Sequence, residues 1–192
     1  IAWIFEYLER NIGYLIAGKP NNFEVSSRLG SEEVFVIEAD EYDTAFFDKR
    51  AKFIHYHPDV LVLNNIEFDH ADIYSDLSQI QKQFHHLIRT LPEDASIIFP
   101  ETDKNIETLF ELGCWSNKIG FSNNKDSDNY YIALKEDFSS SQIVSGENVS
   151  NLNWPMLGEH NAMNAMSAIL ACQQCGIKIE DSIKALEAFL GI

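Results

Sequence analysis

The chain has 192 residues, 45% of them hydrophobic, and a formal net charge of −16. This composition supports a globular core and argues against non-specific binding to nucleic acids or anionic membranes, because both require clusters of Lys and Arg. Three cysteines, an odd number, and the lack of a recognisable secretion signal or long apolar run favour a cytoplasmic location.

Helices and strands are predicted to alternate along the first two thirds of the chain. Apolar residues at helical spacing predict a helix over residues 1–12, and because this pattern is already under way at Ile1, we expect a fragment whose true N-terminus lies upstream. The further predictions are strands over 14–17, 34–37, 60–63, 96–99 and 118–121, of which 34–37 is expected to be buried, and helices over 76–91 and 103–112. A polar loop is predicted over 18–33, and helix 76–91 is expected to have one apolar face, formed by Leu77, Ile80, Phe84, Leu87, Ile88 and Leu91. This alternation predicts an α/β fold with a mostly parallel sheet flanked by helices.

The last third of the chain follows a different pattern. Alternating apolar and polar residues predict strands over 130–135, 142–145 and 151–157, which would form a small antiparallel β appendage. Two helices are predicted to follow, over 160–175 and 180–190. No shift in composition divides the chain, so we expect one domain over residues 1–192.

Two predicted strands are followed directly by acidic side chains. The runs are Glu38-Ala39-Asp40-Glu41-Tyr42-Asp43 after strand 34–37 and Asn65-Ile66-Glu67-Phe68-Asp69-His70-Ala71-Asp72 after strand 60–63. In open α/β sheets, ligands bind beyond the carboxyl ends of strands. We expect the two strand ends to be adjacent, and their carboxylates and imidazole then predict a divalent cation holding a phosphate. The alternatives are that Glu38 is an ordinary exposed acid and that His70 forms a surface salt bridge.

A third motif, Gly158-Glu159-His160-Asn161-Ala162-Met163-Asn164-Ala165, opens a predicted helix. Asn161 and Asn164 share a helix face, and a carboxamide matches the N6/N7 edge of adenine. Capping of the helix start is the simpler explanation for these residues. The chain contains no Gly-x-x-x-x-Gly-Lys-Ser/Thr phosphate loop, and such a loop would normally precede a helix such as the first one.

Together and in this order, the three motifs resemble those of the central ATP-binding domain of the Mur ligases, which join an amino acid or peptide to a UDP-sugar carboxylate during peptidoglycan synthesis. The resemblance covers essentially all 192 residues. It implies a P-loop-type domain with the N-terminal phosphate loop missing, and with the UDP-sugar domain and the C-terminal amino-acid-binding domain absent. We therefore expect the fragment alone to be inactive.

The resemblance also implies cofactors and site residues. ATP would phosphorylate the muramyl carboxylate to an acyl phosphate, with Mg²⁺ at the transferring phosphoryl group. Glu38 would bind one Mg²⁺ and His70 a second, and Asn65 would lie beside the substrate carboxylate. Asn161 and Asn164 would bind adenine, with His160 beside the ring.

Within the family, three segments favour ligases that join L-Ala-γ-D-Glu-meso-diaminopimelate to UDP-N-acetylmuramate in peptidoglycan recycling. They are residues 18–23, 38–50 and 83–87. The L-alanine-adding ligase usually has Glu-Ala-Asp-Glu-Ser-Asp and a shorter connection to the histidine motif, and it is the alternative within the family. A metal-dependent phosphohydrolase and a non-catalytic binding module are the alternatives from other classes.

Overall fold

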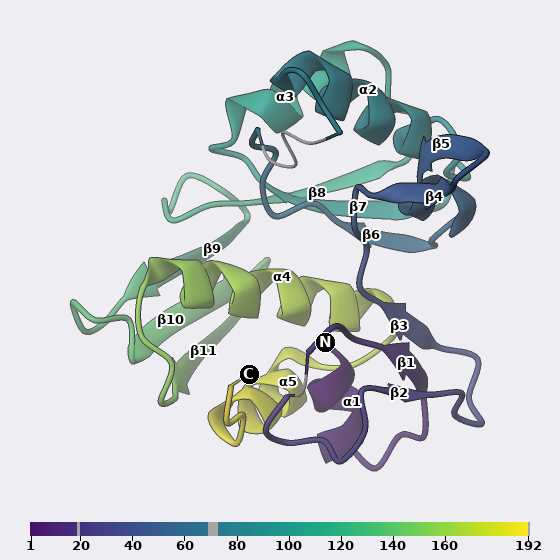
Figure 1. Cartoon of the computed structure of the whole chain (residues 1–192). Coiled ribbons are helices and arrows are strands. Elements are labelled where there is room, and N and C mark those ends of the chain that lie inside the picture. Colours follow the sequence, from purple (N-terminus) through teal and green to yellow (C-terminus); the bar gives the residue numbers. More distant parts are fainter. Residues whose placement is uncertain (19, 69–72, 192) are drawn as a thin grey trace. The chain divides into compact units, whose positions relative to one another are not determined.

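The structure is a computed structural model that describes residues 1–18, 20–68 and 73–191 and divides into two compact units. The first unit comprises Ile1–Glu38 and Phe121–Ile192, and the second comprises Ala39–Gly120 (Figure 1). No change of composition marks either junction, so the division follows from which side chains pack together.

The elements follow the predicted order, with bounds that differ by a few residues. The helices are α1 (Ala2–Tyr7), the 3-10 helix η1 (Lys52–His55), α2 (Leu77–Ile88), α3 (Lys104–Glu111), α4 (Glu159–Gln174) and α5 (Ile179–Glu187). The strands are β1 (Gly13–Leu15), β2 (Ser27–Arg28), β3 (Phe35–Ile37), β4 (Asp43–Ala45), β5 (Asp48–Ala51), β6 (Val60–Val62), β7 (Ser96–Pro100), β8 (Asn117–Phe121), β9 (Asn129–Ala133), β10 (Ser140–Ser145) and β11 (Asn148–Asn153).

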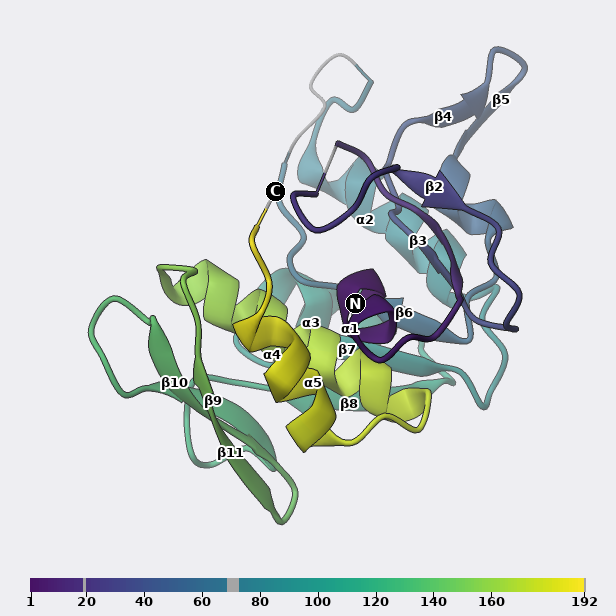
Figure 2. The same cartoon turned by 90° about the horizontal axis from the view of Figure 1, so that it is seen from below.

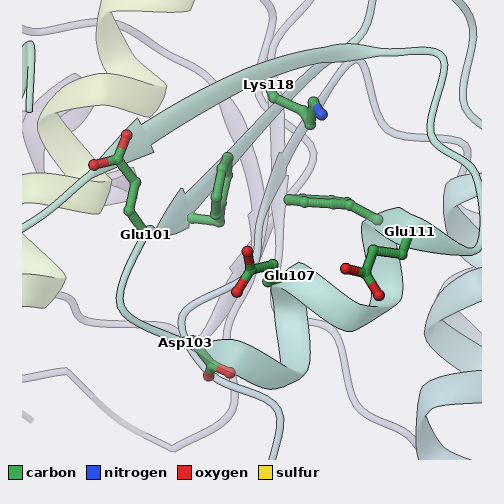
Figure 3. A pocket seen from close by; sticks show the side chains of 7 residues that line it. Glu101, Asp103, Glu107, Glu111 and Lys118 are labelled. Atoms are coloured by element: carbon green, nitrogen blue, oxygen red, sulfur yellow. The ribbon is translucent and has the colours of Figure 1, made fainter.

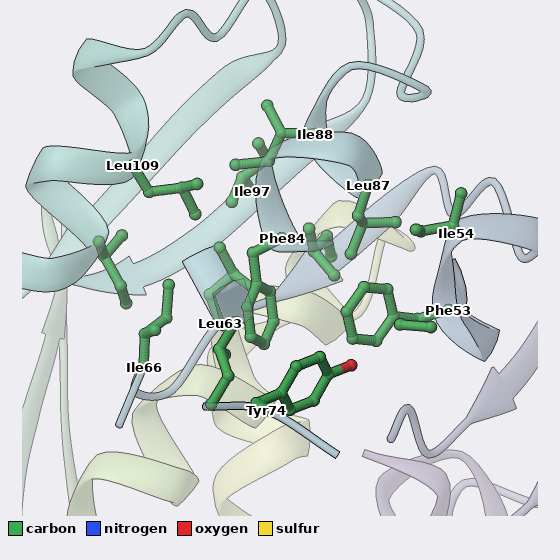
Figure 4. Packing of buried hydrophobic residues seen from close by; sticks show 14 residues of the cluster. Phe53, Ile54, Leu63, Ile66, Tyr74, Phe84, Leu87, Ile88, Ile97 and Leu109 are labelled. Atoms are coloured by element: carbon green, nitrogen blue, oxygen red, sulfur yellow. The ribbon is translucent and has the colours of Figure 1, made fainter. Parts of the chain in front are cut away.

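The second unit is built on a sheet of order β6-β7-β8, in which β6 and β7 pair in parallel. Helices α2 and α3 lie along the same face of this sheet (Figure 1). Apolar side chains from the helices, the sheet and η1 fill the space between them, and Figure 4 shows the stacked rings of Phe53 and Phe84, with centroids 5.0 Å apart, at the centre of this cluster. The sheet and its helices confirm the predicted α/β class.

Helix α2 shows how local sequence defines an element. The Asp76 side chain accepts a hydrogen bond from the Gln79 N–H, which caps the helix start. The predicted apolar face is confirmed, since Ile80, Phe84 and Leu87 are buried in the cluster. The helix ends at Ile88, three residues earlier than predicted, and Pro92 follows soon after.

The first unit contains two sheets. Strand β1 pairs in parallel with β3 and antiparallel with β2, and β9, β10 and β11 form an antiparallel sheet that confirms the predicted appendage. Helix α5 contacts α1, α4 and β11, and Figure 2 shows it beside these elements. The Asn22 side chain donates to the Ala188 carbonyl (3.1 Å) and accepts from the Leu190 N–H (2.7 Å), which fastens the segment after β1 to the end of the chain.

Three sequence predictions are wrong in detail. The helix predicted over 1–12 ends at Tyr7, because Glu9 has a φ of 58° and turns the chain out of the helix. The segment predicted as a loop over 18–33 contains β2. Strand 34–37 is not fully buried, since Phe35 is 49% exposed at the edge of its sheet. In the described part of the chain, no helix combines the length and apolarity needed to cross a membrane.

Candidate active site

Glu38 lies at the carboxyl end of β3, where its backbone continues the ladder with β1. The Glu38 N–H donates to the Leu15 carbonyl (3.0 Å), and the Oε2 of the side chain accepts from the Ala17 N–H (2.8 Å). These two bonds hold the exposed carboxylate over the end of β1. The other oxygen, Oε1, accepts no hydrogen bond from a described residue, so it can take a ligand.

The loop after β6 is fixed at Ile66, whose side chain is buried in the core of the second unit. Its N–H donates to Oδ2 of Asp103 (3.2 Å), and its carbonyl accepts from Nδ2 of Asn105 (2.7 Å). Oδ1 of Asp103 also caps α3 by accepting from the Asn105 and Ile106 N–H groups. The start of α3 therefore holds the loop after β6 through hydrogen bonds to both the N–H and the carbonyl of Ile66, and we call this pair of contacts the clamp.

Sequence reasoning placed Asp103 only at the start of a helix and did not single out Asn105. An Asp followed two residues later by Asn at a predicted N-cap was the available signal, but it indicates capping alone. The bonds to Ile66 join residues 37 and 39 positions apart, so only the structure could reveal them.

Asn65 and Glu67 flank the clamped residue and are both exposed. Nδ2 of Asn65 donates to Oε1 of Glu67 (3.0 Å), which leaves the amide oxygen of Asn65 available. His70, the predicted ligand of the second Mg²⁺, lies outside the described residues, as do Asp69 and Asp72.

Glu38 and Asn65 belong to different units, and their strands β3 and β6 to different sheets. The expectation that the two strand ends meet at one metal site therefore stays a prediction. Within residues 1–18, 20–68 and 73–191, no group of three potential His, Cys, Asp or Glu ligands gathers.

The start of α4 depends on Gly158. This residue has a φ of 89°, and a Cβ placed on it would lie 2.9 Å from Cε1 of His160. A glycine is therefore required for the chain to turn into the helix with the His160 ring folded back beside it. Nδ2 of Asn161 donates to the Leu157 carbonyl (2.7 Å) and lies 3.1 Å from Nε2 of His160.

These contacts differ from the expected capping. The N-cap residue is Gly158, with no side-chain cap, and Asn161 bonds a carbonyl before the helix rather than a free N–H group. Oδ1 of Asn161 has no described donor, and Asn164 is exposed one turn later. His160, Asn161 and Asn164 thus lie together on the first turns of α4.

Glu159, which sequence reasoning did not single out, anchors this helix start to β9. Its Oε1 accepts from Nδ2 of Asn123 (2.7 Å) and from the Tyr131 hydroxyl (3.3 Å). Burial, with a contribution from the Glu159 charge, raises the pKa of Tyr131 to about 12. The phenol therefore stays protonated at neutral pH and keeps donating to the carboxylate.

A cavity of about 420 Å³ in the second unit lies beside α3. Figure 3 shows its charged lining residues, which are Glu101, Asp103, Glu107, Glu111 and Lys118. Nζ of Lys118 lies 5.4 Å from the centre of the Phe110 ring. Four carboxylates against one ammonium make this cavity unsuitable for an anionic ligand.

A family model described as the Mur ligase middle domain matches residues 17–172. The chain belongs to the Mur ligase family. The matched range includes both acidic strand ends and the Gly-x-His-Asn motif at the start of α4, so the sites described above are parts of a Mur ligase middle domain.

Among the similar Mur ligases is the UDP-N-acetylmuramate–L-alanyl-γ-D-glutamyl-meso-2,6-diaminoheptandioate ligase of Escherichia coli K12. It is 46% identical, over 98% of this chain and 41% of its own length. The UDP-N-acetylmuramate–L-alanine ligase of Hydrogenovibrio crunogenus is 33% identical, over 93% of this chain and 38% of its own length. The chain therefore spans about two fifths of these curated relatives.

The fold also matches solved structures of Mur ligases. The crystal structure of a UDP-N-acetylmuramate:L-alanyl-γ-D-glutamyl-meso-diaminopimelate ligase from Neisseria meningitidis has a TM-score of 0.91 and 40% identity, covering 100% of this chain and 61% of that chain. The expected Mur ligase fold is thereby confirmed over the whole chain.

Proposed function

We propose that the protein is an ATP-dependent ligase that joins L-Ala-γ-D-Glu-meso-diaminopimelate to UDP-N-acetylmuramate in peptidoglycan recycling. We base this proposal on the difference between two kinds of relative in their sequence identity to this chain. The E. coli ligase named for the tripeptide is 46% identical, whereas the H. crunogenus ligase named for L-alanine is 33% identical over a similar range. The three segments that favoured the tripeptide in the sequence support the same choice.

The proposed reaction has two steps. An oxygen of the muramyl carboxylate attacks the γ-phosphorus of ATP, which releases ADP and forms an acyl phosphate. The free amine of the tripeptide then attacks the acyl carbon, the C–O bond to phosphate breaks, and the amine loses a proton. The products are the amide, ADP and inorganic phosphate.

Glu38 fits the role of a Mg²⁺ ligand. Mg²⁺ in such sites takes one or two carboxylates, completed by phosphate oxygens and water. Glu38 is exposed at a strand end, has one oxygen fixed by the Ala17 N–H and has the other oxygen open. When bound, Mg²⁺ would neutralise charge on the transferring phosphoryl group. We propose His70 as the ligand of a second Mg²⁺, from the family motif alone.

We assign the remaining site residues from the same motifs. The amide of Asn65, held next to the clamped Ile66, would orient the muramyl carboxylate. Asn161 and Asn164 would bind adenine, with His160 beside the ring. We also propose that the 192 residues form one middle domain of a longer enzyme whose phosphate loop, UDP-sugar domain and acceptor domain lie outside it, and that the enzyme is cytoplasmic.

Asn161→Ala is expected to raise the KM for ATP about tenfold, because it removes one polar contact to adenine. Its stability cost should be about 1 kcal/mol, because the bond to the Leu157 carbonyl is also lost. Steady-state kinetics of the complete gene product measure the first effect and urea unfolding the second. Asn151→Ala, an exposed site on β11, is the control. A phosphohydrolase without an adenine site would keep its activity in Asn161→Ala.

The decisive experiment follows phosphate release from ATP by the complete gene product with Mg²⁺ and UDP-N-acetylmuramate. Either the tripeptide or L-alanine is added as acceptor. We expect turnover to depend on the tripeptide and to be weak or absent with L-alanine. Turnover with L-alanine alone would assign the first biosynthetic step instead. Phosphate release without any acceptor would favour a phosphohydrolase, and no ATP turnover would favour a binding module.

A further inference from the structure

The second unit carries a cavity of about 740 Å³ on the side of α2 that faces the β4-β5 hairpin. This volume lies within the range of roughly 300–1,000 Å³ that is typical of small-molecule sites. Its lining comes from three places in the sequence: Asp43, Lys49 and Arg50 of the hairpin, Ile73 and Tyr74 after β6, and Gln79, Lys82, Gln83 and His86 of α2. We call this cavity the basic groove.

The basic groove concentrates cations in a chain whose net charge is −16. Lys49 pairs with Asp43 (2.6 Å). Arg50 uses Nε and Nη2 on an Asp48 carboxylate that is outside the lining, which leaves its Nη1 free to donate. Lys82 forms no ion pair with any described residue. Asp43 and Asp48 thus pair with Lys49 and Arg50, and Lys82 is the cation of the lining that pairs with no carboxylate of a described residue.

His86 lies close to cations of the groove, whereas Tyr74 faces carboxylates: burial and the charges of Glu41, Asp43 and Asp40 raise the pKa of Tyr74. Burial lowers the pKa of His86, and neighbouring basic groups, Lys82 foremost, lower it further. At neutral pH its imidazole is therefore neutral and can donate one hydrogen bond without adding charge. The amides of Gln79 and Gln83 add polar groups on the same helix.

The basic groove and the acidic cavity beside α3 have opposite lining charge within one unit. An anionic ligand would be repelled by the four carboxylates of the acidic cavity and attracted to the basic groove. The groove also begins at Ile73 and Tyr74, which directly follow the segment carrying the predicted metal ligand His70. Tyr74 is fixed there, since its hydroxyl donates to the Glu41 carbonyl (2.5 Å).

We propose that the basic groove binds acid groups of a ligase substrate, with Lys82 and Arg50 as their principal cationic partners. The ligand group would be a carboxylate or a phosphate, and in both cases its oxygens would accept charge-assisted hydrogen bonds. Both substrates of the proposed reaction supply such groups: the tripeptide has free carboxylates, and UDP-N-acetylmuramate has a diphosphate. This proposal rests on the proposed function for the identity of the ligand, but not for its anionic character.

The test compares Lys82→Ala and Lys82→Glu with Lys125→Ala, a control that removes an exposed lysine of the first unit. In the complete gene product, we expect Lys82→Ala to raise the KM of one substrate about tenfold, since it removes one charge-assisted contact. Lys82→Glu should raise it further, whereas kcat at saturation and the thermal midpoint stay close to wild type. A rise for the tripeptide assigns its carboxylates to the groove, and a rise for UDP-N-acetylmuramate assigns its diphosphate.

Calorimetric titration of pyrophosphate into the same proteins separates this proposal from the ligase assignment, because it needs no turnover. We expect wild type and Lys125→Ala to bind pyrophosphate equally and Lys82→Glu to bind it at least tenfold more weakly. If wild type turns over the tripeptide but Lys82→Glu retains both KM values and the pyrophosphate affinity, the groove proposal is overturned and the ligase stands. If wild type shows no ligase turnover, loss of pyrophosphate binding in Lys82→Glu still supports an anion site.

Discussion

Glu38→Gln is expected to reduce the ligase turnover of the complete gene product by on the order of 100-fold or more, because a metal contact at a transferring phosphoryl group is worth several kcal/mol. The amide oxygen of Gln can still accept from the Ala17 N–H, so the strand end keeps its conformation. The variant loses only the negative charge that Mg²⁺ requires. Phosphate release measured across a Mg²⁺ titration should show a higher Mg²⁺ requirement as well as a lower maximal rate.

Glu33→Gln provides the matched control, because it removes an exposed carboxylate just before β3 without touching the strand end. Its rate and Mg²⁺ dependence should equal those of wild type, which separates the role of Glu38 from the effect of one unit of net charge. The free energy of unfolding of both variants should stay within about 0.5 kcal/mol of wild type, as is usual at surface sites. Wild-type Mg²⁺ dependence in Glu38→Gln would show that Glu38 is an ordinary exposed acid.

Asp103→Ala is expected to lower the free energy of unfolding by about 2–4 kcal/mol, from about 1 kcal/mol for the α3 cap and about 1–3 kcal/mol for the unsatisfied Ile66 N–H. Turnover should also fall, since the loop carrying Asn65 would lose its fixed position and small displacements of orienting groups slow catalysis. Urea unfolding followed by circular dichroism measures the stability, and phosphate release measures the rate.

Two further variants separate the cap of α3 from the clamp on the loop. Asp76→Ala removes the cap of α2 without affecting the hydrogen bonds to Ile66, and should cost only about 1 kcal/mol. Asp103→Asn keeps an oxygen for the α3 cap but turns an NH₂ group toward the Ile66 N–H, so it should reduce turnover while retaining most of the stability. Equal costs for Asp103→Ala and Asp76→Ala, with full turnover in Asp103→Asn, would refute the clamp.

Features that depend on neighbouring residues could be predicted from the amino-acid sequence. The apolar spacing in α2 predicts which side chains are buried, and Asp76 and Asp103 mark the starts of two helices. Glu38 follows its strand directly, so its place at a strand end needed no tertiary information. The motifs of the Mur ligases are likewise short runs, and their order alone indicated the family that the comparisons confirm. Periodicity, capping and adjacency are local properties, and local properties can be read from the chain.

Contacts between residues distant in the sequence could be identified only from the folded chain. The Asp103 and Asn105 clamp on Ile66, the Asn22 bonds to the end of the chain and the basic groove between α2 and the β4-β5 hairpin all join segments remote in sequence. The early end of α1 and the exposure of Phe35 also depend on how the first unit packs rather than on residue spacing. A polar side chain can satisfy its hydrogen bonds with many partners, and only the path of the folded chain selects among them.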